Sequence, residues 1–216
     1  MKVIPLQLEV SQSIGNVSAE LIAPEQPKAI VALAHGAGAG MNHPFMTALA
    51  NELGRLNIAT LRFNFPFTEQ KKRRPDFPAV AHKTIEVAIN NAHELFSNIP
   101  LFVSGKSFGG RMSSQYLSKS QPDFVKGIIF FGFPLHPPGK LTVDRAEHLK
   151  DVRVPMLFLQ GTRDELAVWN LIEKVTGELS VATLVKLEGA NHAFKSGKEN
   201  LIPVLAMATG EWITKI

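Results

Sequence analysis

A serine lies at the centre of the pattern Gly105-Lys106-Ser107-Phe108-Gly109, between a predicted strand at 101–104 and a predicted helix at 108–117. A serine at the apex of a sharp strand-to-helix turn is typical of a nucleophile, because the turn lifts its hydroxyl clear of the sheet. Glycines two residues to either side remove the Cβ atoms that such a bend would bring into collision. The pattern therefore predicts a reactive hydroxyl at Ser107, with the backbone N–H of Phe108 directed at a developing oxyanion.

Two other structures are compatible with part of this pattern, a solvated turn and a phosphate-binding loop. A glycine-rich turn with a solvated serine would have the same sequence. Gly105-Lys106-Ser107 also resembles the end of a phosphate-binding loop, but that loop needs a glycine five residues before Gly105, where the chain has Pro100. The predicted strand also continues almost to Gly105 and leaves no room for a loop around phosphates.

A neutral serine needs an adjacent base, usually a histidine oriented by a carboxylate. On a sheet of this kind the order along the chain is serine, acid, histidine. Asp164 follows a predicted strand at 156–160, and His192 is the only histidine beyond it. The order predicts a Ser107–Asp164–His192 triad. Taken alone, Asp164 could cap the next helix, Glu165 could replace it as the acid, and His192 could be an ordinary loop histidine.

The glycine-rich stretch at 35–40 follows an apolar run at 29–34 and predicts the second half of an oxyanion hole. We expect the backbone N–H of Ala37 to pair with that of Phe108, and Gly36 to border the substrate. His35 is predicted to anchor this loop. The alternative is a flexible glycine loop without a role in catalysis.

The remaining patterns alternate between strands and helices. Strands are predicted at 3–10, 17–23, 29–34, 58–63, 101–104, 127–131, 156–160 and 181–187, and helices at 44–56, 79–96, 108–117, 143–149, 166–175 and 199–213. The segment 64–78 predicts a surface loop. This order predicts a single α/β domain over 1–216: a three-layer sandwich with a mostly parallel sheet, an antiparallel N-terminal hairpin and no large cap domain. In such sheets ligands bind beyond the carboxyl ends of the strands.

Composition narrows the class of protein. The chain has 216 residues, 45% of them hydrophobic, and no cysteine, which excludes disulfides, a thiolate nucleophile and cysteine-bound metals. No apolar run is long enough to cross a bilayer, so we expect a cytoplasmic protein without a membrane partner. The net charge of +4 is concentrated in the basic run Lys71–Arg74. A solvated loop is favoured there over a nucleic-acid site, because no interleaved aromatics or recognition helix accompany it.

Over nearly its whole length the sequence resembles the α/β-hydrolase superfamily, on the strength of His35-Gly36, the Gly105–Gly109 turn, Asp164 and Asn191-His192. It looks closest to the small dienelactone-hydrolase-like proteins. Two stretches are similar to the hydrolase-like domain of the third subunit of the NSL histone-acetyltransferase complex: Arg62-Phe63-Asn64-Phe65-Pro66 and Lys106-Ser107-Phe108-Gly109-Gly110-Arg111-Met112. Dienelactone hydrolases proper use a cysteine nucleophile, which this chain lacks, so their substrate is not carried over.

The segment between the strands at 127–131 and 156–160 is only about two dozen residues, so we expect an uncapped site. Phe133 is predicted to border the substrate with Phe131, Pro134 and Leu135, unless these residues are ordinary core packing. Arg62, with Lys71–Arg74 and Arg111, suggests an anionic acyl group.

These features together predict a serine hydrolase, monomeric or homodimeric, that cleaves a small carboxylic ester or thioester without a metal or cofactor. The alternatives are a non-catalytic interaction module that keeps the fold, and a cofactor-free perhydrolase with the same triad.

Overall fold

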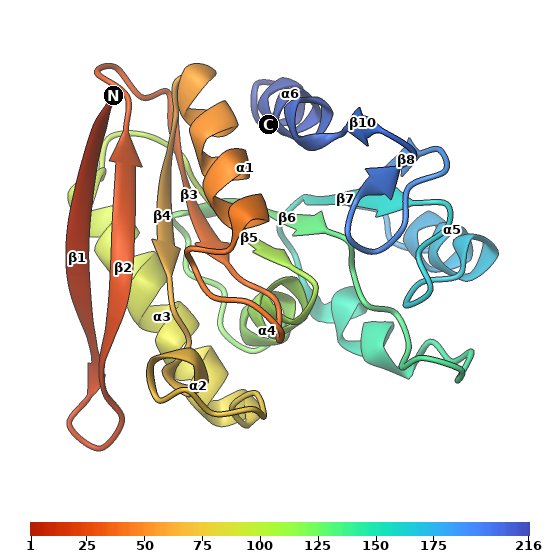
Figure 1. The fold of residues 1–216 in the computed structure, drawn as a ribbon, viewed down its shortest axis with the longest axis horizontal. Helices are drawn as coiled ribbons and strands as arrows, with labels where there is room; N and C mark the ends of the chain where they lie inside the picture. Colours follow the sequence, from red (N-terminus) through yellow and green to blue (C-terminus); the bar gives the residue numbers. More distant parts are fainter.

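A twisted eight-stranded sheet organises the computed structural model, which describes residues 1–216 (Figure 1). Its spatial order is β1-β2-β4-β3-β5-β6-β7-β8. The strands are β1 (Lys2–Ser11), β2 (Gly15–Ala23), β3 (Ala29–Ala34), β4 (Ile58–Phe63), β5 (Leu101–Lys106), β6 (Val125–Phe131), β7 (Met156–Gly161) and β8 (Ala182–Leu187). β3 to β8 are parallel, whereas β2 runs antiparallel to both β1 and β4.

Helices cover both faces of the sheet. On one face α1 (Pro44–Arg55) and α6 (Ile202–Ile213) lie side by side, while α3 (Pro78–Leu95), α4 (Phe108–Leu117), the 3₁₀ helix η1 (Asp144–Asp151) and α5 (Trp169–Gly177) pack on the other (Figure 1). Strand β3 shows why its sequence is continuously apolar. Ala29, Val31 and Leu33 pack toward α1 and α6, and the alternate residues pack toward α3 and α4. The three-layer sandwich predicted from the sequence is therefore confirmed.

The connections between the strands determine where a ligand site can form. From β3 the chain passes through α1 to β4 on one side, and from β5 it passes through α4 to β6 on the other. The loops after β3 and β5 thus diverge from neighbouring strands, which is where open α/β sheets bind their ligands. The connection from β6 to β7 holds η1 and loops, and no cap covers the sheet. None of the helices combines the length and apolarity that a membrane span requires.

Three predicted segments differ from the structure. The predicted surface loop at 64–78 contains α2 (Pro66–Glu69), and Phe65 and Phe67 are buried because their rings stack on each other, 6.0 Å apart. α5 begins at Trp169, three residues late, because the preceding loop carries Asp164. The last helix begins at Ile202 and not at residue 199, because Glu199–Asn200 form β10, which pairs with β9 (Lys195–Ser196) in a short hairpin.

Candidate active site

Ser107 occupies the sharp turn between β5 and α4. Its backbone has φ 51° and ψ −113°, a conformation that residues with a Cβ atom rarely adopt. A Cβ added to Gly105 would lie 2.2 Å from the Gly110 nitrogen, and one added to Gly109 would lie 2.6 Å from the Ala34 carbonyl oxygen. The two glycines thus let α4 pack directly against β5 and against the end of β3.

The structure brings Ser107, Asp164 and His192 into one hydrogen-bonded row. His192 Nε2 lies 2.8 Å from Ser107 Oγ, and His192 Nδ1 lies 2.8 Å from Asp164 Oδ2. An ionised carboxylate only accepts hydrogen bonds, so the imidazole proton resides on Nδ1 and the Nε2 lone pair faces the hydroxyl. This geometry allows the imidazole to accept the proton of Ser107.

Asp164 accepts hydrogen bonds from two groups besides His192. Its side chain is buried, with Oδ2 accepting from Gln160 Nε2 at 2.6 Å and Oδ1 accepting from the Leu166 N–H at 2.8 Å. Asp164 therefore supports the turn before α5 and the imidazole at the same time. Glu165, the alternative acid, is exposed.

The loop after β3 lies against the serine. A Cβ on Gly36 would sit 3.7 Å from Ser107 Cβ, and the Ala37 N–H makes no backbone hydrogen bond. Phe108 is the first residue of α4, so its N–H has no acceptor within the helix. Two free amides on either side of Ser107 are the arrangement that an oxyanion hole requires.

His35 anchors this loop, as the sequence predicted. It is fully buried, its Nδ1–H donates to the Gly36 carbonyl at 2.8 Å, and its Nε2 accepts from the Phe65 N–H at 3.0 Å. Burial lowers the pKa of His35 to about 4, which keeps the ring neutral at physiological pH. The start of the segment predicted as a surface loop, at Phe65, is thus buried and supports the loop that carries Ala37.

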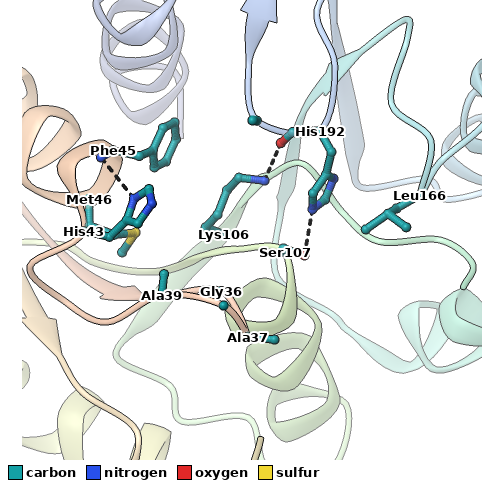
Figure 2. A pocket seen from close by; sticks show the side chains of 12 residues that line it. Gly36, Ala37, Ala39, His43, Phe45, Met46, Lys106, Ser107, Leu166 and His192 are labelled. Carbon is teal, nitrogen blue, oxygen red and sulfur yellow. Dashed lines mark hydrogen bonds between the residues drawn. The ribbon is translucent and has the colours of Figure 1, made fainter. Parts of the chain in front are cut away.

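A cavity of about 310 Å³ opens above the serine (Figure 2). It is lined by Gly36, Ala37, Gly38, Ala39, His43, Phe45, Met46, Lys106, Ser107, Leu166, His192 and Ala193. Met46 and His43 lie to one side of Lys106, and Leu166 lies beyond His192 on the other. Apart from the triad residues, Lys106 and His43, its side chains are apolar.

Two predicted substrate-binding residues lie elsewhere, and the prediction for them is corrected. Arg62 is 2% exposed, forms an ion pair with Glu20 and donates to the Met41 carbonyl at 2.8 Å. Phe133 is fully buried against Phe130 and Phe158, with ring centroids 5.2 and 5.9 Å away. Both side chains belong to the interior because their strands and loops are covered by helices.

The other cationic residues suggested for an anionic substrate also do not line the cavity. Lys71–Arg74 is an exposed loop, and Arg111 lies outside the set of lining residues. His136 is buried and accepts from the Val168 N–H at 3.2 Å, so it joins two loops rather than facing the serine.

Several residues that line the cavity were not predicted from the sequence. Lys106 belongs to the phosphate-loop pattern and to the stretch Lys106–Met112, and its place directly before Ser107 was a usable signal. Phe45 and Met46 lie in the first turn of α1, just after the glycine-rich loop, and Leu166 follows Asp164. The proximity of these residues depends on how three loops meet.

Comparisons with known proteins agree with the fold. A dienelactone hydrolase from Anabaena variabilis is similar at 20% identity, with 99% of this chain and 97% of that chain covered and a TM-score of 0.80. An α/β serine hydrolase without lid from Xanthomonas campestris is 20% identical over 98% and 95% of the chains, with a TM-score of 0.77. The esterase domain of a Rhodothermus marinus protein is 16% identical over 100% and 99%, with a TM-score of 0.76.

Residues 27–202 match the sequence model of the family described as the α/β hydrolase domain. The matched segment begins just before β3 and includes the serine turn, Asp164 and His192. The similarity to dienelactone-hydrolase-like proteins expected from the sequence is supported by the structural comparison. Because the family model matches most of the length of this chain, the chain belongs to the α/β-hydrolase domain family.

Proposed function

We propose that the protein is a serine hydrolase that cleaves a small carboxylic ester or thioester through an acyl-enzyme on Ser107. The observation that carries this proposal is the hydrogen-bonded row in which His192 lies 2.8 Å from both Ser107 Oγ and Asp164 Oδ2. The strained backbone at Ser107 supports it, because strain of this kind is maintained where a hydroxyl must be presented to substrate.

Each step of the reaction has a group to perform it. As Ser107 Oγ bonds to the carbonyl carbon, its proton passes to His192 Nε2, and the carbonyl oxygen becomes an oxyanion near the N–H groups of Ala37 and Phe108. The bond to the leaving group then breaks, and His192 donates that proton to the departing alcohol or thiol. Water repeats the sequence and releases the acid. Each oxyanion donor contributes about 3 kcal/mol to the transition state.

Asp164 completes the proposed mechanism. As His192 takes up the proton, the buried carboxylate stabilises the imidazolium and keeps its Nε2 pointed at the reacting atoms. The hydrogen bonds from Gln160 and Leu166 fix the carboxylate in turn, so that little reorganisation accompanies proton transfer.

The cavity favours a short, uncharged acyl group. Its volume of about 310 Å³ is at the low end for small-molecule sites, and Phe45, Met46 and Leu166 supply apolar walls. The suggestion of an anionic acyl group loses its basis, since Arg62 is already paired and Arg111 is not at the cavity. Lys106 is the one lysine or arginine that lines the cavity, and its ammonium already donates to a backbone carbonyl.

A panel of p-nitrophenyl esters tests the proposal. We expect hydrolysis to be fastest with short neutral acyl chains, to decline as the chain outgrows the cavity, and to be slower for an ester with a terminal carboxylate. Ser107→Ala removes the nucleophile and should reduce kcat by roughly a million-fold, as when the serine of other triads is removed. A fluorophosphonate probe should label the wild type at Ser107 and leave Ser107→Ala unlabelled.

The same probe separates the enzyme from a non-catalytic module of the same fold. Folded wild-type protein that is neither labelled at neutral pH nor active on any ester of the panel would contradict the hydrolase proposal and favour the module. Circular dichroism of both proteins provides the folding control.

A further inference from the structure

Lys106 is the last residue of β5 and directly precedes the nucleophile. Its side chain extends across the cavity to the loop that follows β8, where Nζ donates to the backbone carbonyl of His192 at 2.6 Å (Figure 2). Lys106, the residue directly before Ser107, is thus hydrogen-bonded to the main chain of His192, the proposed base.

The ammonium is partly withdrawn from water in this contact. Lys106 has no carboxylate within ion-pairing distance, and its Nζ lies 5.1 Å from the centre of the Phe194 ring. Gly132, at φ +71°, provides the space: a Cβ there would lie 3.2 Å from Lys106 Nζ and 3.6 Å from Asp164 Oδ2. A partly buried cation without an ion-pair partner has a desolvation cost, so its retention at this position calls for a role.

The loop that carries His192 is tied to the turn after β7 at its start, where the Arg163 N–H donates to the Ala190 carbonyl at 2.9 Å and the Gly189 N–H donates to Thr162 Oγ1 at 2.8 Å. Residues 191–194, which include the base itself, have fewer attachments. Asn191 Oδ1 accepts from the N–H groups of Ala193 and Lys195, and the Phe194 N–H donates to the Asn191 carbonyl, but all of these bonds are local. Beyond the imidazole itself, the bond from Lys106 is the one hydrogen bond that ties residues 191–194 to another part of the sheet.

We propose that Lys106 is a positioning residue. Its hydrogen bond fixes the position of the His192 backbone relative to Ser107, so that His192 Nε2 stays within hydrogen-bonding distance of the serine hydroxyl. The inference rests on the proposed function for its catalytic consequence, and on the observed contacts for the tether itself. Because a displacement of about 1 Å in a reacting group can reduce a rate about 100-fold, loss of the tether should act on kcat.

Lys106→Met tests the proposal, since methionine keeps the apolar stem and removes the ammonium. We expect kcat for the best ester of the panel to fall roughly 10- to 100-fold with little change in KM. Lys106→Arg, which keeps a cationic donor, should recover part of this loss. Lys126→Met is the matched control: Lys126 also donates to a carbonyl, that of Asp123 at 3.1 Å, but it is exposed and outside the cavity.

The pH profile is a readout that a purely structural role would not change. The groups facing Lys106 are Asp164 and Glu165, which raise its pKa, His192, and His43 across the cavity. Burial outweighs the two carboxylates and lowers the pKa of Lys106 to about 8, so the ammonium is present below that pH and is lost above it. Wild-type kcat should therefore decline as the pH rises through about 8, and Lys106→Met should lack this decline.

Hydrogen–deuterium exchange of residues 188–196 reports the tether independently of turnover. Faster exchange in Lys106→Met than in wild type and Lys126→Met supports the proposal. Unchanged exchange, or wild-type kcat with an unchanged pH profile, overturns it. Should the wild type fail to react with the fluorophosphonate, the hydrolase proposal falls, whereas the exchange measurement still decides whether Lys106 holds this loop.

Discussion

Asp164 shows how much a single carboxylate does at the residue scale. Its two oxygens accept from Gln160, His192 and the Leu166 N–H at 2.6, 2.8 and 2.8 Å, and the side chain is 1% exposed. With both oxygens occupied, it presents only an acceptor to His192 Nδ1. This is what directs the imidazole lone pair toward Ser107.

Asp164→Asn should reduce kcat roughly 10,000-fold while leaving the protein folded. An amide that donates to His192 Nδ1 places the ring proton on Nε2, where the ring can no longer accept the proton of Ser107. Steady-state ester hydrolysis measures the loss, and thermal unfolding checks the fold.

Glu165→Gln is the matched control for this substitution, because Glu165 is adjacent but exposed. Its kcat should stay close to that of the wild type. A large loss of kcat in Glu165→Gln, together with an active Asp164→Asn, would show that Glu165 and not Asp164 is the acid.

The sequence allowed the hydrogen-bonded row of Ser107, Asp164 and His192 to be predicted, because their order along an α/β sheet leaves few candidates. Arg62 could not be placed in this way. The sequence shows its charge, but its partner Glu20 lies 42 residues earlier and faces it only after β2 pairs with β4. Lys106 was missed for a similar reason, since its acceptor lies 86 residues later on another loop.

At the scale of elements, the site depends on close approach between the end of β3 and the start of α4. The bounds of β3, β4 and α4 follow the predicted ones because apolar runs and the glycine pattern define them locally. The segment 64–78 is an exposed loop from residue 70 on, as predicted, but its start is not. Its charged and proline residues outweigh Phe65 and Phe67 in the sequence pattern, and the burial of these two rings depends on contacts with Phe108.

Gly109→Ala should destabilise the protein by about 1–3 kcal/mol and lower its activity. The new Cβ would lie 2.6 Å from the carbonyl oxygens of Ala34 and His35, and these backbone atoms cannot move without separating β3 from α4. Urea unfolding followed by circular dichroism measures the change in the free energy of unfolding.

Gly177→Ala serves as the control, because a Cβ there meets no atom within 4 Å. Its unfolding free energy should be unchanged or slightly higher. Equal stability of the two variants would show that the contact between β3 and α4 is less tight than described.

At the scale of the whole molecule, three loops from well-separated parts of the chain meet at the carboxyl edge of one sheet. The sequence predicted this edge from the alternation of strands and helices, and it predicted the absence of a cap from the short connection between β6 and β7. It did not predict the shape of the cavity, because Phe45, Met46 and Leu166 reach it from loops and helix ends whose geometry depends on the assembled sheet.

The short connection between β6 and β7 also bears on the fate of the proposed acyl-enzyme. The cavity opens to solvent, so nothing in the fold reserves the acylated serine for water. A small alcohol that reaches the carbonyl carbon can give its proton to His192 as water does, and the product is then a new ester. We expect added glycerol or methanol to divert part of the acyl group into transesterification, measured as the ratio of ester to free acid by chromatography. Free acid alone at high alcohol concentration would mean that the site discriminates between water and other nucleophiles without a cover.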